Sequence, residues 1–553
     1  MSPMSIQQTL DLAKQHHDAG RWAQAESLYR QLLAEQPDHA EALHLLGTLA
    51  LQTSRPQEAA HLIGRAVELD ARCPEYHCNL GLSLAKLGRM QEAVDAYHRA
   101  LAIRPEFAEA FYNLGIALRA HGRVREAIAA YRAAIALKPN DANAYSNLGN
   151  ALTQDGQYEQ AFDALRTALA LQPDFPGALW NLGIAMQNSG RTQEAIALFS
   201  RLIEAHPDFI DAYENFGAAL QSAARFDEAG AVWRRGLALR PDAATLHWNL
   251  GLLLLLQGDF QQGWPEYEWR KRVPAFRELM PDFTQPMWDG GDLRPKRILL
   301  HAEQGFGDTI HFARYVQAVA AGGGKILLAC QPKLLRLMKS LHGVAQFVAT
   351  NQALPDFDLH CPLPSLPHVL GLHEPQSLPW RGAYLHSEEA LRRKFADVLE
   401  QAGAKLKVGL VWSGRAQPPG RSVPLAMLAP LADPRVQFYS LQVGEGAEQA
   451  KSAPSGMQLS DATDRISDFA DTAALMDQLD LIVSIDTAAA QLAGAMGKAV
   501  WTLLKHVPDW RWMLRRSDSP WYPTMRLFRQ EKDGDWTRPI QRAAMELKSL
   551  LAS

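Results

Sequence analysis

The sequence predicts an α-helical solenoid followed by an α/β region that contains two Rossmann-like lobes. Two observations carry this prediction. Seven glycines recur every 34 residues in the first half of the chain, up to Gly251, and apolar runs that alternate with helical stretches begin at Arg297. A strict repeat of this length is typical of stacked helical hairpins, and strands that alternate with helices are typical of parallel sheets.

The repeat has the period of a tetratricopeptide array. An alanine follows each repeat glycine by 12 residues until the last, and prolines close most of the repeats. Small residues let paired helices approach closely, and proline ends a helix because it has no N–H to donate. We therefore expect eight stacked helical hairpins, which with a terminal cap form a solenoid over residues 6–272. The repeat glycines are Gly47, Gly81, Gly115, Gly149, Gly183, Gly217 and Gly251.

An asparagine lies two residues before six of these glycines, on the helix expected to face the concave side of the solenoid. An amide both donates and accepts hydrogen bonds, so a row of amides can hold the backbone of an extended peptide. The alternative is that each asparagine bonds a neighbouring helix or loop, and both roles can coexist. The predicted peptide-binding residues are Asn79, Asn113, Asn147, Asn181, Asn215 and Asn249.

Composition narrows the class of protein. The chain has 553 residues, is 47% hydrophobic and carries a formal net charge of −4. This gives no electrostatic case for binding nucleic acid or an anionic membrane. The N-terminus lacks an apolar signal core, and the five leucines at 252–256 are too few to span a bilayer, so we expect a cytoplasmic protein. The four cysteines lack the paired spacing of metal ligands, and we expect them to pack in the interior.

The repeat ends after Gly251. The run GDFQQGWPEYEWRKR that follows reads as a terminal cap, and a stretch rich in proline and glycine predicts a connector over residues 273–296. Two sets of strands alternating with helices predict one lobe over residues 297–385 and a second over residues 386–553. The strand runs are RILLHA and KILLAC in the first lobe, and KVGLVWSG, QFYSLQVG, LDLIVSID and AVWTLL in the second. Ligands of such sheets bind beyond the carboxyl ends of the strands, so functional residues are expected in the turns that follow them.

The first such turn runs from Glu303 to Thr309. Its glycines, Gly305 and Gly307, can bring backbone amides close to a ligand, and Asp308 could point into a cleft between the lobes. The alternative is an aspartate that caps the following helix beside a tight turn.

The second turn follows the strand LDLIVSID and comprises Asp486, Thr487, Ala488 and, one helical turn later, Gln491. Small residues at the start of the helix leave its N–H groups open to a phosphate. The alternative is a capped helix packed on a sheet.

The third turn runs from Ser413 and Gly414 through a PPG sequence to Arg421, a cation that could neutralise a phosphate. The alternative is a solvated arginine. Further on, Trp510, Trp512, Trp521 and Tyr522 could stack on a nucleotide base or serve only for packing.

Three stretches carry a family resemblance: EQGFGDTIHFARY, VGLVWSG followed by RSVPL, and ISDFADTAALMDQLDLIVSIDTAAAQLAGAMGKAVWTLL. In this order after the repeats they resemble bacterial tetratricopeptide proteins with a glycosyltransferase-B domain. Their C-terminal part is similar to the ADP-heptose heptosyltransferases. The layout, with its asparagine row, also resembles the eukaryotic O-linked N-acetylglucosamine transferases. The resemblance implies a glycosyltransferase-B fold with an acceptor-side lobe at 297–385 and a nucleotide-sugar-binding lobe at 386–553.

The resemblance also implies roles for individual residues. Asp308 matches the catalytic base of the heptosyltransferases, Asp486 and Thr487 match residues that bind the donor's sugar and phosphate, and Arg421 matches a basic phosphate ligand. The family carries a histidine where this chain has Gln491, which can donate a hydrogen bond but cannot become cationic. His311 is a second candidate base, although ordinary placement on the helix surface is the alternative.

These features predict an inverting, metal-independent transfer of a sugar to a serine or threonine of a protein held by the repeats. The nucleotide sugar is a co-substrate, and no other cofactor is expected. The resemblance points to flagellin or another exported protein as the acceptor, modified before export. The alternative function is a tetratricopeptide adaptor whose glycosyltransferase-like domain is inactive or only senses a nucleotide.

Overall fold

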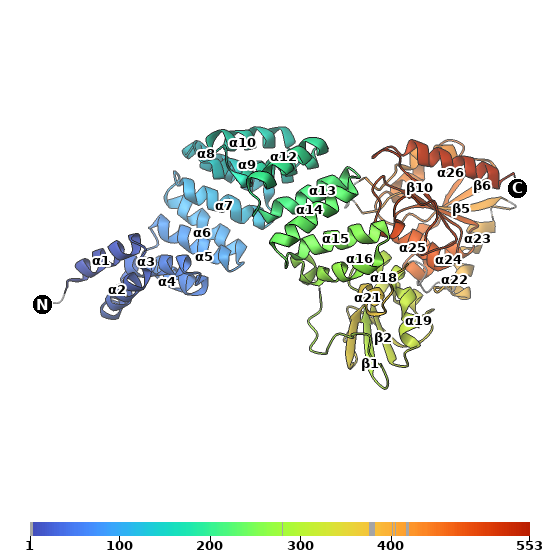
Figure 1. The fold of residues 1–553 in the computed structure, drawn as a ribbon, viewed down its shortest axis with the longest axis horizontal. Helices are drawn as coiled ribbons and strands as arrows, with labels where there is room; N and C mark the ends of the chain where they lie inside the picture. Colours follow the sequence, from blue (N-terminus) through green and yellow to red (C-terminus); the bar gives the residue numbers. More distant parts are fainter. Residues whose placement is uncertain are drawn as a thin grey trace. The chain divides into compact units, whose positions relative to one another are not determined.

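Figure 1 shows the computed structural model of the chain, which describes residues 4–278, 280–374, 382–400, 402–403, 405–415 and 420–552. The chain divides into two compact units, residues 1–223 and 224–553. The first unit holds thirteen described helices, and the second holds three further repeat helices and two parallel sheets.

The first unit is a series of antiparallel helical pairs, as the repeat predicts. Each hairpin joins a helix of 13 residues to one of 14. The helices are α1 Ile6–Asp18, α2 Trp22–Glu35, α3 Ala40–Gln52, α4 Pro56–Leu69, α5 Pro74–Lys86, α6 Met90–Ile103, α7 Ala108–Ala120, α8 Val124–Leu137, α9 Ala142–Gln154, α10 Tyr158–Leu171, α11 Pro176–Asn188, α12 Thr192–Ala205 and α13 Ile210–Ser222.

The close approach of paired helices explains the repeat glycines. In α7, a Cβ atom added to Gly115 would lie 2.6 Å from a ring carbon of Tyr131 in α8. Tyr131 is fully buried, and so is Ala127, which faces the same interface from α8. A side chain at position 115 would therefore displace a ring that has no space to move into.

The last helices of the array belong to the second unit: α14 Phe226–Leu239, α15 Ala244–Gln257, α16 Phe260–Tyr267 and the 3₁₀ helix η1 Glu268–Arg272. The repeat pattern predicts a solenoid that extends to residue 272, and its last helices pack with the α/β region in one compact unit. Trp264 of the cap is fully buried and packs edge-on against Trp510, with ring centroids 5.4 Å apart. Phe260 packs on Trp521 at 5.5 Å. This apolar packing joins the cap to the α/β region.

The predicted connector holds one short helix, α17 Pro274–Arg277, and ends where the first strand begins. The first sheet has the order β3-β2-β1-β4, with all strands parallel. Its strands are β1 Arg297–His301, β2 Lys325–Cys330, β3 Val344–Ala349 and β4 Leu359–Pro362. The associated helices are α18 Phe306–Phe312, η2 Ala313–Tyr315, α19 Val316–Ala320, α20 Pro332–Met338, η3 Leu363–Ser365 and α21 Leu366–Val369.

The second sheet has the order β10-β9-β8-β5-β6-β7 and is also parallel. Numbered along the chain within this sheet, the order is that of a doubly wound nucleotide-binding fold, which reverses direction between β5 and β8. The strands are β5 Leu406–Val411, β6 Val436–Ser440, β7 Leu459–Asp461, β8 Leu481–Ile485, β9 Val500–Leu504 and β10 Met525–Arg529. Both lobes predicted from the sequence therefore contain a parallel sheet.

Helices and 3₁₀ turns flank this second sheet. They are α22 Glu389–Arg392, η5 Arg393–Phe395, α23 Ala396–Glu400, η6 Leu425–Leu431, η7 Ala447–Ser452, η8 Thr463–Arg465, α24 Phe469–Asp477, α25 Ala488–Ala495, η9 Trp510–Trp512 and α26 Thr537–Leu550. The buried core includes apolar residues of β5, β6, β8 and β9 together with η6 and α26. Every residue of β6, β8 and β9 is buried, as expected for strands covered on both faces.

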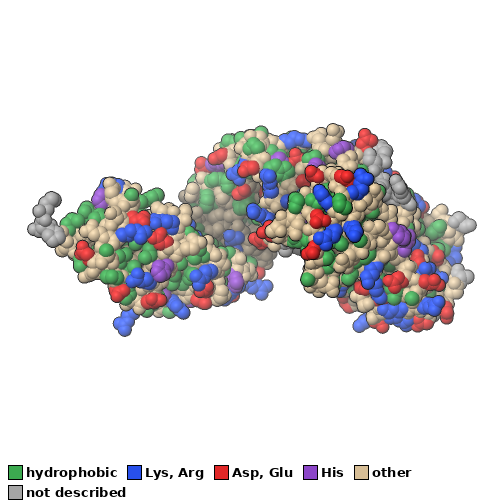
Figure 2. Space-filling model, turned by 90° about the horizontal axis from the view of Figure 1, so that it is seen from below, with side chains coloured by type: hydrophobic (Ala, Val, Ile, Leu, Met, Phe, Trp, Pro, Cys, Tyr) green, Lys and Arg blue, Asp and Glu red, His purple; other side chains and the backbone are tan. Residues whose placement is uncertain are grey.

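Charged side chains of both signs are interspersed over the face of the molecule seen in Figure 2, in keeping with the near-balanced composition. Cys78, Cys330 and Cys361 are buried and unoxidised, so they pack in the interior as expected, while Cys73 is half-buried. Within the part of the chain that the structure describes, no helix combines the length and the apolar character needed to cross a bilayer.

We predict that Gly115→Ala destabilises the first unit by about 1–3 kcal/mol, because the added methyl group overlaps the buried ring of Tyr131. Gly64→Ala is the matched control, since Gly64 lies inside α4 and an added Cβ meets no atom within 4 Å. That variant should gain up to about 1 kcal/mol from the lower entropy of its unfolded chain. Thermal unfolding followed by circular dichroism measures both changes, and equal behaviour of the two variants would contradict the close-packing account.

Candidate functional site

A cavity of about 820 Å³ lies in the second unit. The turns that follow β1, β5, β6, β8 and β9 line it, together with α15 and the start of α24. In parallel sheets the carboxyl ends of the strands share one edge, so loops distant in sequence meet there. The loops after β5 and β8 leave the second sheet at its reversal point. The cavity therefore occupies the position where doubly wound sheets bind ligands.

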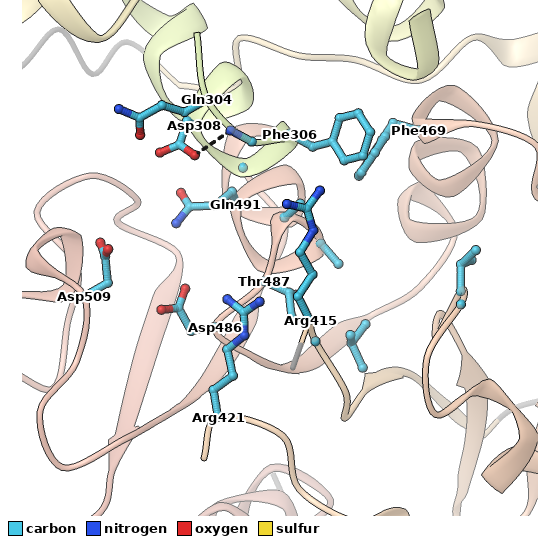
Figure 3. Close-up of a pocket in the computed structure, with 18 of the residues that line it drawn as sticks. Gln304, Phe306, Asp308, Arg415, Arg421, Phe469, Asp486, Thr487, Gln491 and Asp509 are labelled. Atoms are coloured by element: carbon cyan, nitrogen blue, oxygen red, sulfur yellow. Dashed lines mark hydrogen bonds between the residues drawn. The ribbon is translucent and has the colours of Figure 1, made fainter. Parts of the chain in front are cut away.

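The structure brings together all ten residues that the sequence assigned to the three turns or to the first candidate base. These lining residues are Gly305, Gly307, Asp308, Ser413, Gly414, Arg421, Asp486, Thr487, Ala488 and Gln491. In Figure 3, Gln491 lies between Asp308 at the top and Asp486 and Arg421 below.

The first turn places Asp308 at the start of α18. Its Oδ2 atom accepts a hydrogen bond at 3.1 Å from the backbone N–H of Gly305, which is the N-cap residue of α18. Asp308 therefore supports the helix start from the third helical position and is not itself the N-cap residue. Its Oδ1 atom accepts a bond from the Nη2 group of Arg511. Burial raises the pKa of Asp308 above its ordinary value, and the charge of Asp509 adds to this, while Arg511 opposes it. The Asp308 carboxylate therefore accepts a backbone hydrogen bond and also forms an ion pair with Arg511.

The second turn is closed by a short polar contact. Thr487 is the N-cap residue of α25, and its hydroxyl lies 3.1 Å from that of Ser484. Gly307 of the first turn packs against this helix start, because a Cβ atom at position 307 would lie 3.5 Å from the Cα of Ala488. Burial, followed by the charge of Asp509, raises the pKa of Asp486 to about 6. The pocket thus holds an acid that titrates near neutral pH.

The third turn is held by a glutamine that follows β6. Gln442 Oε1 accepts hydrogen bonds from the backbone N–H groups of Trp412 and Ser413, at 3.0 and 2.8 Å. A Cβ atom on Gly414 would lie 2.9 Å from Nε of Arg421, so the guanidinium packs closely on this glycine. The charge of Arg421 lowers the pKa of Asp486 against the effect of burial. Pro418 and Pro419 of the PPG sequence lie outside the described residues.

His311 does not line the pocket. It is fully buried, and its Nδ1 atom lies 3.3 Å from Oε1 of Gln491. The hydroxyl of Tyr522 donates to the same Gln491 oxygen at 2.7 Å. Burial lowers the pKa of His311 well below its ordinary value, with contributions from Arg314 and Arg511. The sequence left two roles open for His311, a catalytic base or a residue on the helix surface. The structure shows neither, because the side chain is buried and contacts Gln491, which separates it from the pocket. Asp308 therefore remains the candidate base.

The aromatic segment near the C-terminus serves mainly for packing. Trp512, Trp521 and Tyr522 are fully buried, which agrees with the packing alternative, and only Trp510 among the four reaches the pocket.

Several lining residues were missed by the sequence analysis. Phe306 and Phe469 come from different lobes and face each other with ring centroids 5.1 Å apart (Figure 3). Asp509 and Arg511 follow β9, and their position beyond the carboxyl end of a strand is the signal that could have identified them.

Four asparagines of the predicted peptide-binding row bond a side chain 35 residues earlier, on the preceding repeat. Asn147 donates to the hydroxyl of Tyr112 at 2.9 Å, and Asn215 accepts from the indole N–H of Trp180 at 2.7 Å. Asn79 bonds His44 at 2.8 Å, and Asn181 bonds Ser146 at 3.0 Å. These contacts realise the neighbouring-helix alternative, and the peptide-binding role of the six residues stays a prediction.

Nowhere in the described ranges do three or more histidine, cysteine, aspartate or glutamate side chains gather as they would around a metal ion.

Comparisons with known proteins identify the repeats. A family model described as tetratricopeptide repeat matches residues 10–72, 44–106, 78–142, 112–174 and 215–263, and a second model with the same description matches residues 152–220. Protein FlbA of Caulobacter vibrioides is 28% identical over 338 residues, which are 54% of this chain and 54% of that protein. The match thus spans about half the length of this relative.

Solved structures are similar to part of the chain. MamA from Desulfovibrio magneticus is 28% identical, covering 30% of this chain and 94% of that one, with a TM-score of 0.29. YrrB, described as a tetratricopeptide protein with an unusual peptide-binding site, is 21% identical, covering 34% of this chain and 96% of that one, with a TM-score of 0.28. The tetratricopeptide repeats of the N-terminal half, predicted from the period, are therefore confirmed by the family models.

The raised pKa of Asp486 predicts a pH dependence of stability. The folded value of about 6 exceeds the unfolded value of 3.8, so the free energy of unfolding should fall as pH rises between these two values. Asp486→Asn removes the cost of the buried charge and should stabilise the protein by about 1–3 kcal/mol above pH 6, with little gain below pH 4.

Denaturant unfolding of wild type and Asp486→Asn over this pH range measures the effect. Asp356→Asn, which removes a carboxylate that is 93% exposed, is the matched control. A difference between wild type and Asp486→Asn that does not change with pH would contradict the assignment.

Proposed function

We propose that the protein transfers a sugar from a nucleotide-sugar donor to a serine or threonine hydroxyl of a protein bound by its repeats. One observation carries the proposal: Asp308, from the lobe that contains the first sheet, faces the start of α25 and Arg421, from the lobe that contains the second, across one pocket (Figure 3). In a glycosyltransferase-B domain, one lobe is expected to supply the groups that act on the acceptor, and the other lobe is expected to bind the donor.

The donor would bind through its phosphate. The backbone N–H groups at the start of α25 and the guanidinium of Arg421 supply positive charge at the reversal point of the sheet. The cavity volume of about 820 Å³ lies in the range of pockets that hold small molecules and cofactors. These groups would stabilise the departing phosphate without a metal ion.

Asp308 would act as the general base. It would take the proton of the acceptor hydroxyl while the oxygen forms a bond to the anomeric carbon. The bond from that carbon to the phosphate oxygen breaks, and its electron pair leaves with the nucleotide. Direct displacement of this kind inverts the anomeric carbon. Burial, which raises the pKa of Asp308, strengthens it as a base.

The repeats indicate a protein–protein interaction, and we propose that they select the acceptor. Flagellin or another exported protein, modified in the cytoplasm, is the acceptor we propose to test first. The second candidate function is an adaptor that binds a nucleotide without transferring a sugar. Gln491 favours it, because its neutral amide stands where the heptosyltransferases carry a histidine.

The base assignment predicts that Asp308→Asn lowers the transfer rate by about 10²–10⁴-fold, because an amide cannot accept the hydroxyl proton. Nucleotide binding should persist, since the phosphate ligands are untouched. Mass spectrometry of the acceptor measures transfer, and a thermal shift with the nucleotide measures binding. Full turnover by this variant would rule out Asp308 as the base, and nucleotide binding by a wild type that never modifies a protein would favour the adaptor.

The asparagine row predicts that the double variant Asn147→Ala, Asn215→Ala weakens acceptor binding by roughly 5-fold or more per amide lost. Hydrolysis of the donor should be spared, because both residues lie in the first unit. Asn140→Ala, in an exposed turn outside the row, is the control. Equal loss of acceptor binding and donor hydrolysis would indicate damaged folding and contradict the role in acceptor binding.

A further inference from the structure

Arg511 lies between two carboxylates at the wall of the pocket. It belongs to η9, the 3₁₀ helix that begins directly after Asp509, and the residue is 8% exposed. Its Nη1 group donates to Oδ1 of Asp509 at 2.8 Å, and its Nη2 group donates to Oδ1 of Asp308. The side chain lines the cavity that we propose as the donor site. One guanidinium therefore joins the candidate base to the loop after β9.

The guanidinium is held in place by aromatic rings. Its central carbon lies 4.5 Å from the ring centroid of Trp510 and 5.7 Å from that of Phe312. The Nε atom is buried and has no hydrogen-bond partner among the described residues. A buried N–H group needs an acceptor, and beside a cavity either a water molecule or a ligand can supply it.

The cavity lining is balanced in charge, with four carboxylates and four basic side chains, Arg511 among the latter. Asp308, Asp509 and Asp486 all line the same cavity as Arg511, and the hydroxyl-bearing ring of Tyr267 reaches it from the cap. A guanidinium forms paired hydrogen bonds with phosphate as readily as with carboxylate, because both anions match its fork of donors. A phosphate in this cavity would therefore compete with Asp308 for Arg511.

We propose that Arg511 is a ligand of the donor's phosphate and that Asp308 and the phosphate compete for its guanidinium. This inference rests on the proposed function, and it adds a binding residue and a consequence for the base. When the phosphate takes the Nη2 group, the Asp308 carboxylate loses the cation that weakens it as a proton acceptor. Binding of the donor's phosphate would thus strengthen Asp308 as a base.

The competition can be measured by binding alone. We would determine dissociation constants of UDP, GDP, ADP, TDP and CMP by titration calorimetry for four proteins: wild type, Asp308→Asn, Arg511→Met and the double variant. Arg511→Met should weaken the best nucleotide by about 10- to 100-fold, as expected for loss of a charge-assisted hydrogen bond. Asp308→Asn should tighten it several-fold, because the guanidinium loses its competing carboxylate.

The double variant separates competition from simple charge repulsion. Competition requires that Asp308→Asn tightens binding more when Arg511 is present than when methionine replaces it. Repulsion between Asp308 and the phosphate gives an equal or larger gain in the methionine background, and that result would overturn the inference. Unchanged affinity in Arg511→Met would overturn it as well.

Two further controls keep the outcome clear. The melting temperature of each variant without nucleotide reports folding, and Arg511→Lys replaces Arg511→Met if the latter does not fold. Lysine keeps the charge but loses the fork, so its affinity should lie between those of wild type and Arg511→Met. If the wild type bound none of the nucleotides, the proposed donor site itself would be refuted. If the wild type bound a nucleotide and the affinity did not depend on Arg511, only this inference would be refuted.

Discussion

The buried ion pair between Arg270 and Glu303 fixes the position of the glycine turn on which the candidate site depends. Arg270 belongs to the cap after the last repeat helix and is fully buried. Its Nε and Nη2 groups donate to the two carboxylate oxygens of Glu303, each at 2.8 Å, and Nη2 also donates to Ser365 at 2.8 Å. Arg270 also donates to Glu268 at 2.6 Å, so it is the loss of Arg270 that would leave the buried Glu303 carboxylate uncompensated, at a typical cost of about 3–5 kcal/mol.

This pair connects the end of the repeats to the candidate site in the α/β region. Glu303 precedes Gly305 by two residues, and the next residue, Gln304, donates from its side chain to the hydroxyl of Tyr267 in the cap at 3.0 Å. The cap therefore holds both residues that lead into the turn of Asp308. From the other lobe, the start of α25 packs against Gly307 of the same turn. Contacts from two sides therefore fix the position of the turn, which is what the proposed transfer would require of it.

The sequence revealed those parts of the structure that follow from local rules. The 34-residue period predicted the helical pairs, and the apolar runs predicted β1, β2, β5, β6, β8 and β9. The strands β3, β4, β7 and β10 were not predicted, because short or half-exposed strands carry little periodic signal; β7 has only three residues, and none of them is buried. The three turns could be placed together from sequence because parallel strands bring their carboxyl ends to one edge.

Contacts between distant segments could not be inferred in this way. The pairing of Arg511 with Asp308 spans 203 residues, and the burial of His311 depends on rings supplied by Trp510 and Trp521. The same holds for the early start of the second unit, which results from aromatic packing between the cap and the segment after β9. The sequence pattern predicts which residues lie at the ends of the strands. Which of these side chains then face the pocket depends on tertiary packing.

The most direct test of this account is a thermal-shift screen of the full chain against UDP, GDP, ADP, TDP and CMP sugars, with Arg421→Ala as the matched variant. A ligand that binds only the folded state raises the melting temperature. The account predicts a clear rise with one nucleotide in the wild type and a smaller or absent rise in Arg421→Ala. No rise with any of these compounds at millimolar concentration, or an equal rise in both proteins, would contradict a donor site at the reversal point of the second sheet.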